Sequence, residues 1–133
     1  MKPSDDCPCG SGCQFARCCG IYLGAGAAAP TAAALMRSRY SAYVLGNETY
    51  LRQTWHPSTR PEALHLDQEP APQWIGLTVV AVKGGNEEDA DGSVEFVARY
   101  KINGKANRVH EISRFVKEQG RWFYLDGKVD SET

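Results

Sequence analysis

The residues with the clearest potential for chemistry are four cysteines near the start of the chain, which form two closely spaced pairs. Cys7 and Cys9 flank Pro8, and Cys18 and Cys19 are adjacent, so that a turn-forming segment separates the pairs. Zinc binds cysteine thiolates well, and four of them complete the tetrahedral shell of a structural site, which leaves no position open for water. The spacing therefore predicts one structural Zn²⁺ ion.

The surrounding sequence favours a local metal site over a disulfide framework. The chain has five cysteines, an odd number, and all of them precede residue 20. Residues 1–23 hold too few apolar side chains to offset the cost of ordering the backbone, about 1–2 kcal/mol per residue, so that a metal or a disulfide must stabilise the segment. The alternatives are reduced cysteines in a disordered tail and a redox-active pair at Cys18 and Cys19.

The strings CPCGSG at residues 7–12 and CCG at residues 18–20 resemble the SEC-C motif. This motif occurs at the C-terminus of the bacterial preprotein translocase ATPase and in many small bacterial proteins. The resemblance implies that the four paired cysteines bind the zinc, with Phe15 at the aromatic position between the pairs. Cys13 stands where the motif usually has a lysine, and its thiol could compete for the metal. In the translocase, similar knuckles are associated with a chaperone and with the ribosome.

After a small-residue linker at residues 24–30, the pattern becomes that of a larger domain, which we assign to residues 31–133. Thr31 is a suitable N-cap, and apolar residues then recur at helical spacing up to Gly46-Asn47, which predicts an amphipathic helix. A second, shorter helix is expected around residues 50–54, because the residue before a proline avoids the helical conformation and Pro57 follows closely.

The remainder of the domain predicts an antiparallel meander of strands at residues 74–83, 93–102, 108–117 and 122–126. Asn103-Gly104 and Gln119-Gly120 are strong signals for tight hairpins. Helices at the start and strands at the end predict an α+β fold, in which the helices pack on one face of a curved antiparallel sheet.

Several strings in this part of the chain resemble the YchJ-like family of bacterial proteins. They are LMRSRYSAY at residues 35–43, TWHPS at residues 54–58, SRF at residues 113–115 and WFYLDG at residues 122–127. The central domain of that family is similar to the nuclear transport factor 2-like fold, so the resemblance implies a cone in which helices close over a strongly curved sheet. Some relatives carry a second knuckle at the C-terminus, whereas no cysteine follows Cys19 here.

This fold often encloses a pocket, and a lining of aromatic and charged residues would suit a small anionic or aromatic ligand. The candidate polar groups are Arg37, Arg39, His56, His110, Glu111, Arg114 and Asp126, although Arg37 and Arg39, two positions apart on a helix, cannot both face one pocket. With the aromatic residues between them, the candidate pocket residues are Tyr40, Tyr43, Trp55, His56, Trp74, His110 and Arg114. Alternation along the strand places His110 and Arg114 on one face and Glu111 and Ser113 on the other, which argues against a His110–Glu111 acid–base pair. No nucleophile with an adjacent base can be named, so the sequence predicts no catalytic residue.

Composition narrows the choice of partners. Lys and Arg number 15 and Asp and Glu 16, so the net charge is −1 and a nucleic-acid partner is not expected. No stretch approaches the ~20 apolar residues of a membrane span, and the first residues lack a signal-peptide pattern, so we expect a soluble cytoplasmic protein.

Two functions follow as alternatives. The first is a zinc-binding adaptor or binding module whose knuckle docks to a protein or ribosomal partner. The second is a small-molecule-binding protein, or a pocket enzyme, of the nuclear transport factor 2-like fold.

Overall fold

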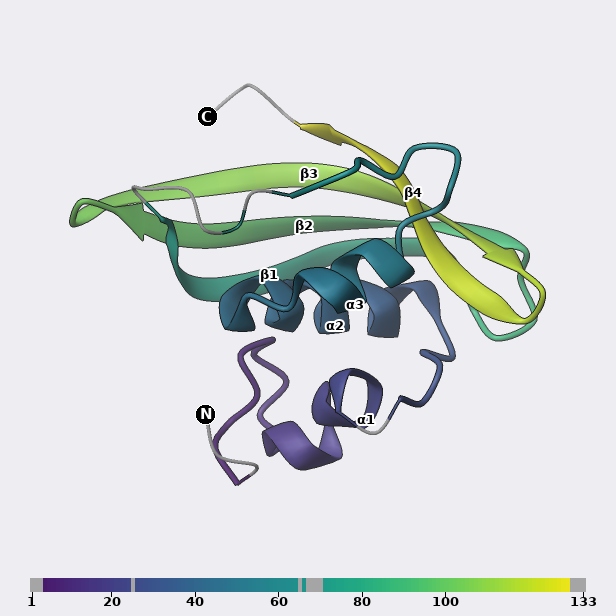
Figure 1. Ribbon diagram of the computed structural model, residues 1–133, viewed down its shortest axis with the longest axis horizontal. Helices are drawn as coiled ribbons and strands as arrows, with labels where there is room; N and C mark the ends of the chain where they lie inside the picture. The colour runs from purple at the N-terminus through teal and green to yellow at the C-terminus, as the bar shows by residue number, and fades with distance from the viewer. Residues whose placement is uncertain (1–3, 25, 65, 67–70, 130–133) are drawn as a thin grey trace.

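The elements of the fold form three layers, seen in Figure 1 as the sheet, the two longer helices and the N-terminal knuckle. The computed structural model describes residues 4–24, 26–64, 66 and 71–129. The knuckle contains the 3₁₀ turn η1 (Phe15–Arg17) and the short helix α1 (Gly20–Leu23), and the middle layer contains α2 (Ala32–Leu45) and α3 (Glu48–Gln53). The sheet contains β1 (Gln73–Gly84), β2 (Asp91–Ile102), β3 (Lys105–Glu118) and β4 (Arg121–Val129). Within the described ranges, no helix has both the length and the apolar character needed to cross a membrane.

Local capping signals fix the ends of α2 and the start of α3. The Thr31 hydroxyl accepts a hydrogen bond from the Ala34 N–H at 3.0 Å, and Gly46 ends α2 with a φ of 70°, a conformation that glycine adopts without strain. The Asn47 side chain accepts from the Tyr50 N–H at 3.0 Å and so caps α3. Both predicted helices are confirmed.

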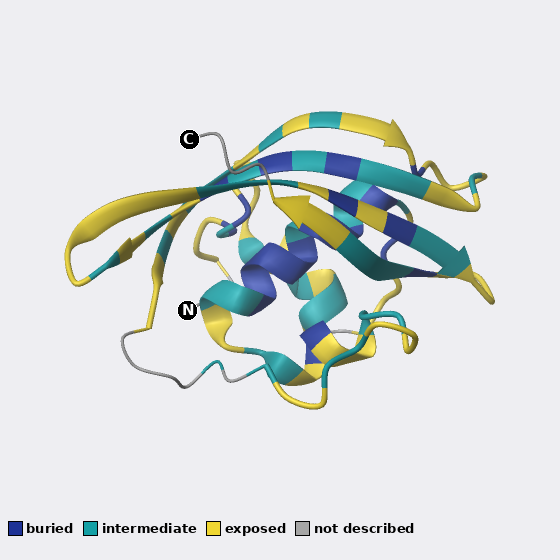
Figure 2. Cartoon of the chain, turned by 90° about the horizontal axis from the view of Figure 1, so that it is seen from above, coloured by how far each residue is buried: buried dark blue, intermediate teal, exposed yellow. Residues whose placement is uncertain are grey.

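The helix α2 is buried on more than the single face that an amphipathic helix would bury. Figure 2 shows a helix whose turns are largely dark blue, the colour of buried residues, near the centre of the molecule. Its buried residues are Ala32, Leu35, Met36, Ser38, Arg39, Tyr40, Ser41 and Ala42. The difference arises because α2 lies between the sheet and the knuckle, so it is covered from both sides. The buried polar side chains have partners; Ser38 Oγ, for example, lies 2.9 Å from the Leu35 carbonyl and 2.6 Å from the Tyr50 hydroxyl.

The four strands form one antiparallel sheet in the order β1-β2-β3-β4, which confirms the predicted meander. The β2–β3 and β3–β4 turns each use two residues with positive φ, Asn103 (52°) and Gly104 (78°) in one and Gln119 (52°) and Gly120 (77°) in the other. Register shifts interrupt β1 at two places and the β3–β4 pairing at one. Such irregularities bend and twist strands, which accounts for the curved sheet that closes over the helices.

One hydrophobic core joins the sheet, the helices and the knuckle. Val94, Phe96, Ala98 and Phe115 contribute from the inner face of the sheet, and the cluster extends through α2 to three of the knuckle cysteines. The linker is fixed to the same body, because the Trp122 indole N–H donates to the Pro30 carbonyl at 3.1 Å. The knuckle and the larger domain therefore share buried surface.

Candidate metal centre and cavity

The knuckle begins with a tight loop that folds the first cysteine pair back along the chain. The Cys7 N–H donates to the Cys13 carbonyl at 2.9 Å, and Asp6 pairs with Gln14 in an isolated antiparallel bridge. Gly10 (φ 79°) and Gly12 (φ 85°) supply the left-handed backbone that the loop requires. The turn η1 then carries the chain back, so the second cysteine pair arrives beside the first.

The sulfur atoms of the four paired cysteines converge on one point. All four Sγ atoms lie within 4.8 Å of one another, and those of Cys9 and Cys18 are 3.6 Å apart. A tetrahedral zinc site with Zn–S bonds of about 2.3 Å has sulfur atoms about 3.8 Å apart, so the spacing fits such a site. Cys7, Cys9 and Cys19 are buried and Cys18 is partly buried. The donor set and its geometry are therefore compatible with a bound metal ion.

Nearby polar groups surround the sulfur atoms and fix the loop that carries them. Ser11 Oγ lies 3.2 Å from Cys18 Sγ, and Ser41 Oγ, on α2, lies 3.6 Å from Cys7 Sγ. Arg37, also on α2, donates through Nη1 to the carbonyl of Cys9 at 3.0 Å. The centre is consequently attached to the middle layer of the fold.

Close contact between the thiols shifts the pKa values of Cys9 and Cys19 in opposite directions. The hydrogen bond from the Cys19 thiol, helped by Ser11, lowers the pKa of Cys9 to about 4, although burial opposes this. The same contact with Cys9, together with burial, strongly raises the pKa of Cys19. One thiolate is thus stabilised at the expense of its neighbour, and a cation between the sulfurs is what would allow all of them to ionise together.

The fifth cysteine stands apart from this centre. Cys13 is exposed, and its sulfur is not one of the converging group. Its carbonyl, by contrast, takes part in the loop through the bond from Cys7. The sequence left open that Cys13 competes for the metal, but in the structure its sulfur lies outside the cluster of four.

On the other side of α2, a cavity of about 290 Å³ lies against the inner face of the sheet. Its lining comes from α2, from all the strands and from Trp55, two residues after the end of α3. The lining residues are Met36, Arg39, Tyr40, Tyr43, Trp55, Trp74, Phe96, Ala98, Val109, Glu111, Ser113 and Tyr124. Four of the candidate pocket residues are among them: Tyr40, Tyr43, Trp55 and Trp74.

The aromatic residues of the lining form two groups. Trp74 meets Tyr40 edge to face, with ring centroids 5.9 Å apart, and lies 6.1 Å from Tyr43. In the other group, Trp55 meets Tyr124 edge to face at 4.9 Å. Burial raises the pKa of both Tyr43 and Tyr124, so their hydroxyls keep their protons at neutral pH.

Arg39 is the buried cation of the cavity. Its side chain is almost wholly enclosed, at 5% exposure for the residue, and its guanidinium carbon lies 4.6 Å from the Tyr124 ring centroid and 5.0 Å from that of Trp55. Nη1 donates to the Leu51 carbonyl and to Thr54 Oγ1, both at 2.7 Å. Burial lowers its pKa, but a guanidinium begins so high that it remains charged.

Glu111 supplies a negative charge to the same cavity, and Trp55 supplies a free donor. Ser113 Oγ donates to Glu111 Oε2 at 2.6 Å. The Trp55 Nε1 atom is buried and has no hydrogen-bond partner among the described residues. Arg39 and Glu111 were candidate polar groups in the sequence, but neither was among the seven candidate pocket residues.

The other three candidate pocket residues do not line this cavity. His110 and Arg114 lie on the opposite face of β3, where His110 Nε2 is 2.6 Å from Glu95 Oε2 and Arg114 Nε donates to Asp126 Oδ1 at 2.6 Å. The reason is the alternation of side chains along the strand, since the odd-numbered residues of this stretch face the helices.

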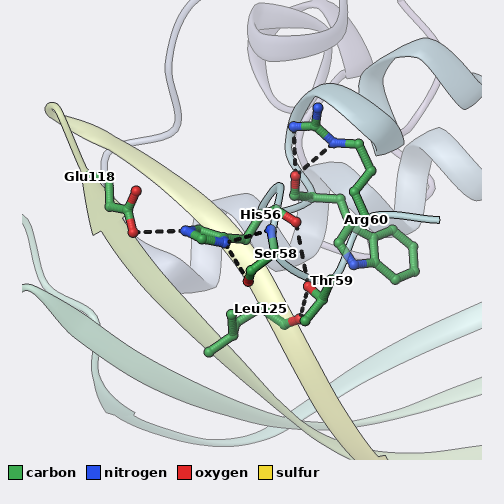
Figure 3. Close-up of polar contacts among 7 residues, drawn as sticks. His56, Ser58, Thr59, Arg60, Glu118 and Leu125 are labelled. Carbon is green, nitrogen blue, oxygen red and sulfur yellow. Dashed lines mark hydrogen bonds and ion pairs between the residues drawn. The ribbon is translucent and has the colours of Figure 1, made fainter. Parts of the chain in front are cut away.

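His56 does not line the cavity but makes polar contacts with Ser58 and Glu118 (Figure 3). Its Nε2 lies 2.7 Å from Glu118 Oε2, and its Nδ1 lies 2.7 Å from Ser58 Oγ and accepts from the Ser58 N–H at 3.1 Å. Because Nδ1 accepts a backbone N–H, Nε2 carries the proton and donates it to Glu118.

This serine–histidine–glutamate row was not foreseen, because Glu118 is 62 positions from His56. Ser58 contacts His56 from two positions further along the chain, and Ser58 does not line the cavity beneath the sheet. Thr59 Oγ1 accompanies them by donating to the Leu125 carbonyl at 2.5 Å. The row fixes the segment after α3 to β3 and β4.

Comparison with known proteins agrees with this architecture. Residues 31–127 match the family domain described as the middle NTF2-like domain of YchJ. A UPF0225 protein of Chromobacterium violaceum is 63% identical over 125 residues, which cover 92% of each chain. A UPF0225 protein of Cupriavidus metallidurans is 53% identical, over 92% of this chain and 88% of the relative.

Two solved structures share the whole arrangement. A SEC-C motif containing protein from Rhodopseudomonas palustris, solved in solution, superposes with a TM-score of 0.81 at 32% identity, covering 94% of this chain and 98% of that one. The crystal structure of a SEC-C motif containing protein from Psychrobacter arcticus gives 0.76 at 29% identity, covering 100% and 88%. The similarity thus extends over the knuckle as well as the larger domain.

Proposed function

Since the chain belongs to the YchJ-like family, with its NTF2-like domain preceded by a SEC-C motif, we propose that it is a zinc-stabilised protein that binds a small molecule in the cavity beneath its sheet. The single observation that carries this proposal is the cavity of about 290 Å³, with an enclosed Arg39 and an unpartnered Trp55 indole N–H. Ligand sites are typically apolar hollows in which a few polar groups fix the orientation of the ligand, and this cavity has that composition.

The metal of the proposal is zinc, and its role is structural. Four thiolates in a tetrahedral arrangement favour zinc over the harder divalent cations, and a full protein shell leaves no position for a substrate. When bound, zinc would neutralise thiolate charge and cross-link the two cysteine pairs. Cys7, Cys9, Cys18 and Cys19 would hold it, with Ser11 and Ser41 against their sulfurs. Elemental analysis of protein purified without added metal should find about one zinc per chain.

A ligand screen on the zinc-loaded full chain tests the binding function. A ligand raises the melting temperature according to ln(1 + [L]/Kd), so compounds at millimolar concentration reveal sites of useful affinity. The variant Ala98→Leu adds bulk inside the cavity, and Ala106→Leu adds the same bulk at an exposed position of β3. A true cavity ligand should stabilise the native protein and Ala106→Leu but not Ala98→Leu. A broad library without a single stabilising compound would contradict the proposal.

Docking of the knuckle to a partner is the second candidate function, and one observation favours it. The metal ligands face inward, whereas residues 10–14 and Arg17 are exposed and present an outer surface of their own. The double variant Gln14→Glu, Arg17→Glu changes this surface without touching a sulfur, and Lys105→Glu changes charge at the remote β2–β3 turn. Docking predicts that ribosome co-sedimentation is reduced by the first change alone. Equal sedimentation of all three proteins, or none, would dismiss a ribosomal partner.

A further inference from the structure

The polar groups of the cavity lie together on one side of its lining. Arg39 stacks on Trp55 and Tyr124, which themselves meet edge to face. Tyr124 and Glu111 are also neighbours, because a side chain added at Gly127 would meet both the Glu111 carboxylate and the Tyr124 hydroxyl. Trp74 contacts both Tyr40 and Tyr43, and these three rings form an aromatic wall of the cavity. A bound molecule would therefore contact the polar residues Arg39 and Glu111 on one side and the rings of Tyr40, Tyr43 and Trp74 on the other.

The charges of the lining balance. Arg39 contributes one positive charge and Glu111 one negative charge, and the other lining residues are apolar, aromatic or hydroxyl-bearing. The three basic candidates, His56, His110 and Arg114, lie elsewhere. An anionic ligand would gain from Arg39 but would also be buried beside the Glu111 carboxylate, and burial makes such repulsion costly. The lining consequently favours a ligand without net charge.

The hydrogen-bonding groups require a ligand with both an acceptor and a donor. Trp55 Nε1 can only donate, and a buried donor without a partner costs about 1–3 kcal/mol. Glu111 can only accept when ionised, and it has capacity beyond the bond from Ser113. Arg39 already donates through Nη1 to Leu51 and Thr54, so its position is fixed by the protein rather than by a ligand.

We propose, on the basis of the binding function above, that the cavity takes a small, neutral, planar aromatic molecule with an amide-type edge. The amide oxygen accepts from the Trp55 indole N–H, the amide N–H donates to Glu111, and the ring packs against Tyr40, Tyr43 and Trp74. The size agrees, since about 290 Å³ is roughly twenty times the ~10–15 Å³ that a cavity needs to hold one water molecule. Such a volume accommodates a single substituted ring and excludes a dinucleotide.

The test compares two molecules that share a ring and differ in charge. Nicotinamide and nicotinate are titrated into the zinc-loaded full chain, with the Trp55 indole N–H observed by NMR, and uracil serves as a probe whose amide belongs to the ring. We expect nicotinamide or uracil to shift the indole resonance and nicotinate to bind at least tenfold more weakly than nicotinamide. Which of the two amides binds distinguishes an exocyclic carboxamide from a nucleobase-type edge.

Variants separate the roles of the two polar residues. Glu111→Gln removes the repulsion of an anion, so it should narrow the preference for nicotinamide over nicotinate. Trp55→Phe removes the donor and should weaken nicotinamide binding about fivefold to tenfold. Arg114→Gln, on the other face of β3, serves as the control and should leave both affinities unchanged.

Three results would overturn the assignment. One is tighter binding of nicotinate than of nicotinamide, and another is an unchanged preference in Glu111→Gln. The third is a failure of both amides when other compounds of the library stabilise the protein through the cavity. Each of these leaves the proposed binding function intact, whereas a library without any cavity ligand removes both.

Discussion

The metal centre makes a countable prediction about thiol reactivity. The chain has five cysteines, of which three are almost completely buried, with exposures of 4% for Cys7, 0% for Cys9 and 1% for Cys19. In the proposed zinc site Cys18 would bind the metal together with them, so only the exposed Cys13 should react quickly with an aromatic disulfide reagent in the zinc-loaded protein. Removal of zinc with a strong chelator should open the knuckle, because its few apolar side chains do not stabilise it alone. The count should then rise from one thiol per chain to five.

Two variants with the same number of cysteines sharpen this experiment. Cys13→Ser removes the exposed thiol and leaves the centre intact, so it should show no fast-reacting thiol with zinc and four after chelation. Cys9→Ser removes a buried ligand, so its four remaining thiols should react quickly even before the chelator is added. Zinc content, measured on the same samples, should be about one per chain in Cys13→Ser and much lower in Cys9→Ser.

The outcome that refutes the reasoning is equally specific. If Cys13→Ser and Cys9→Ser behave alike, or if chelation leaves the count of the native protein at one, the four sulfurs do not depend on a shared metal. A count of one in native protein that chelation leaves unchanged and reductant raises to five would instead indicate two disulfides, because five cysteines leave one thiol unpaired.

Three further perturbations test the fold around the two sites. Gly92→Ala should destabilise the protein by about 1–3 kcal/mol in urea unfolding, because the new Cβ would lie 2.5 Å from the Gly85 backbone, whereas Gly76→Ala, which meets open space, should change it by less than about 1 kcal/mol. Burial raises the pKa of Tyr124, so above pH ~10 the unfolded chain loses this proton while the folded protein keeps it. The free energy of unfolding should then fall by up to about 1.4 kcal/mol per pH unit, and Tyr124→Phe should lack this part of the decrease. Glu118→Gln, which replaces the exposed carboxylate that accepts from His56 Nε2, should change stability by no more than about 1 kcal/mol in thermal unfolding.

The fold class could be predicted from the sequence because its signals are local. The cap at Thr31, the stop at Gly46 and the hairpin at Asn103-Gly104 each act over a few residues, and the structure confirms the elements that they delimit. The burial of α2 on two sides was less accessible. It depends on the knuckle folding back across the helix, and nothing in the periodicity of α2 itself indicates that second neighbour.

The cavity shows where reasoning from sequence stops. Alternation along β3 correctly separated His110 and Arg114 from Glu111 and Ser113, but alternation alone does not say which set faces the helices. That choice depends on which face of the sheet the helices cover, which the pattern of β3 alone does not contain. Conspicuous charged residues were therefore preferred as candidates, although their partners lie across the outer face of the sheet.

Arg39 illustrates a related difficulty. An arginine within a helix is ordinarily a surface residue, and the sequence offers few signs of burial. Here the carbonyl of Leu51, the hydroxyl of Thr54 and two aromatic rings hold the guanidinium inside. These groups come from two segments far apart in the sequence, residues 51–55 and β4, and only the tertiary structure reveals that they meet around Arg39.

The double coverage of α2 also bears on how this protein can evolve. Arg37 reaches the carbonyl of Cys9 and Arg39 reaches the cavity, although the two are only two positions apart. A helix with one solvent face can accumulate substitutions there freely, but most of α2 has no such face. We therefore expect sequence drift among relatives to be slowest between residues 35 and 42, and changes in that stretch to require compensation on both sides of the helix at once.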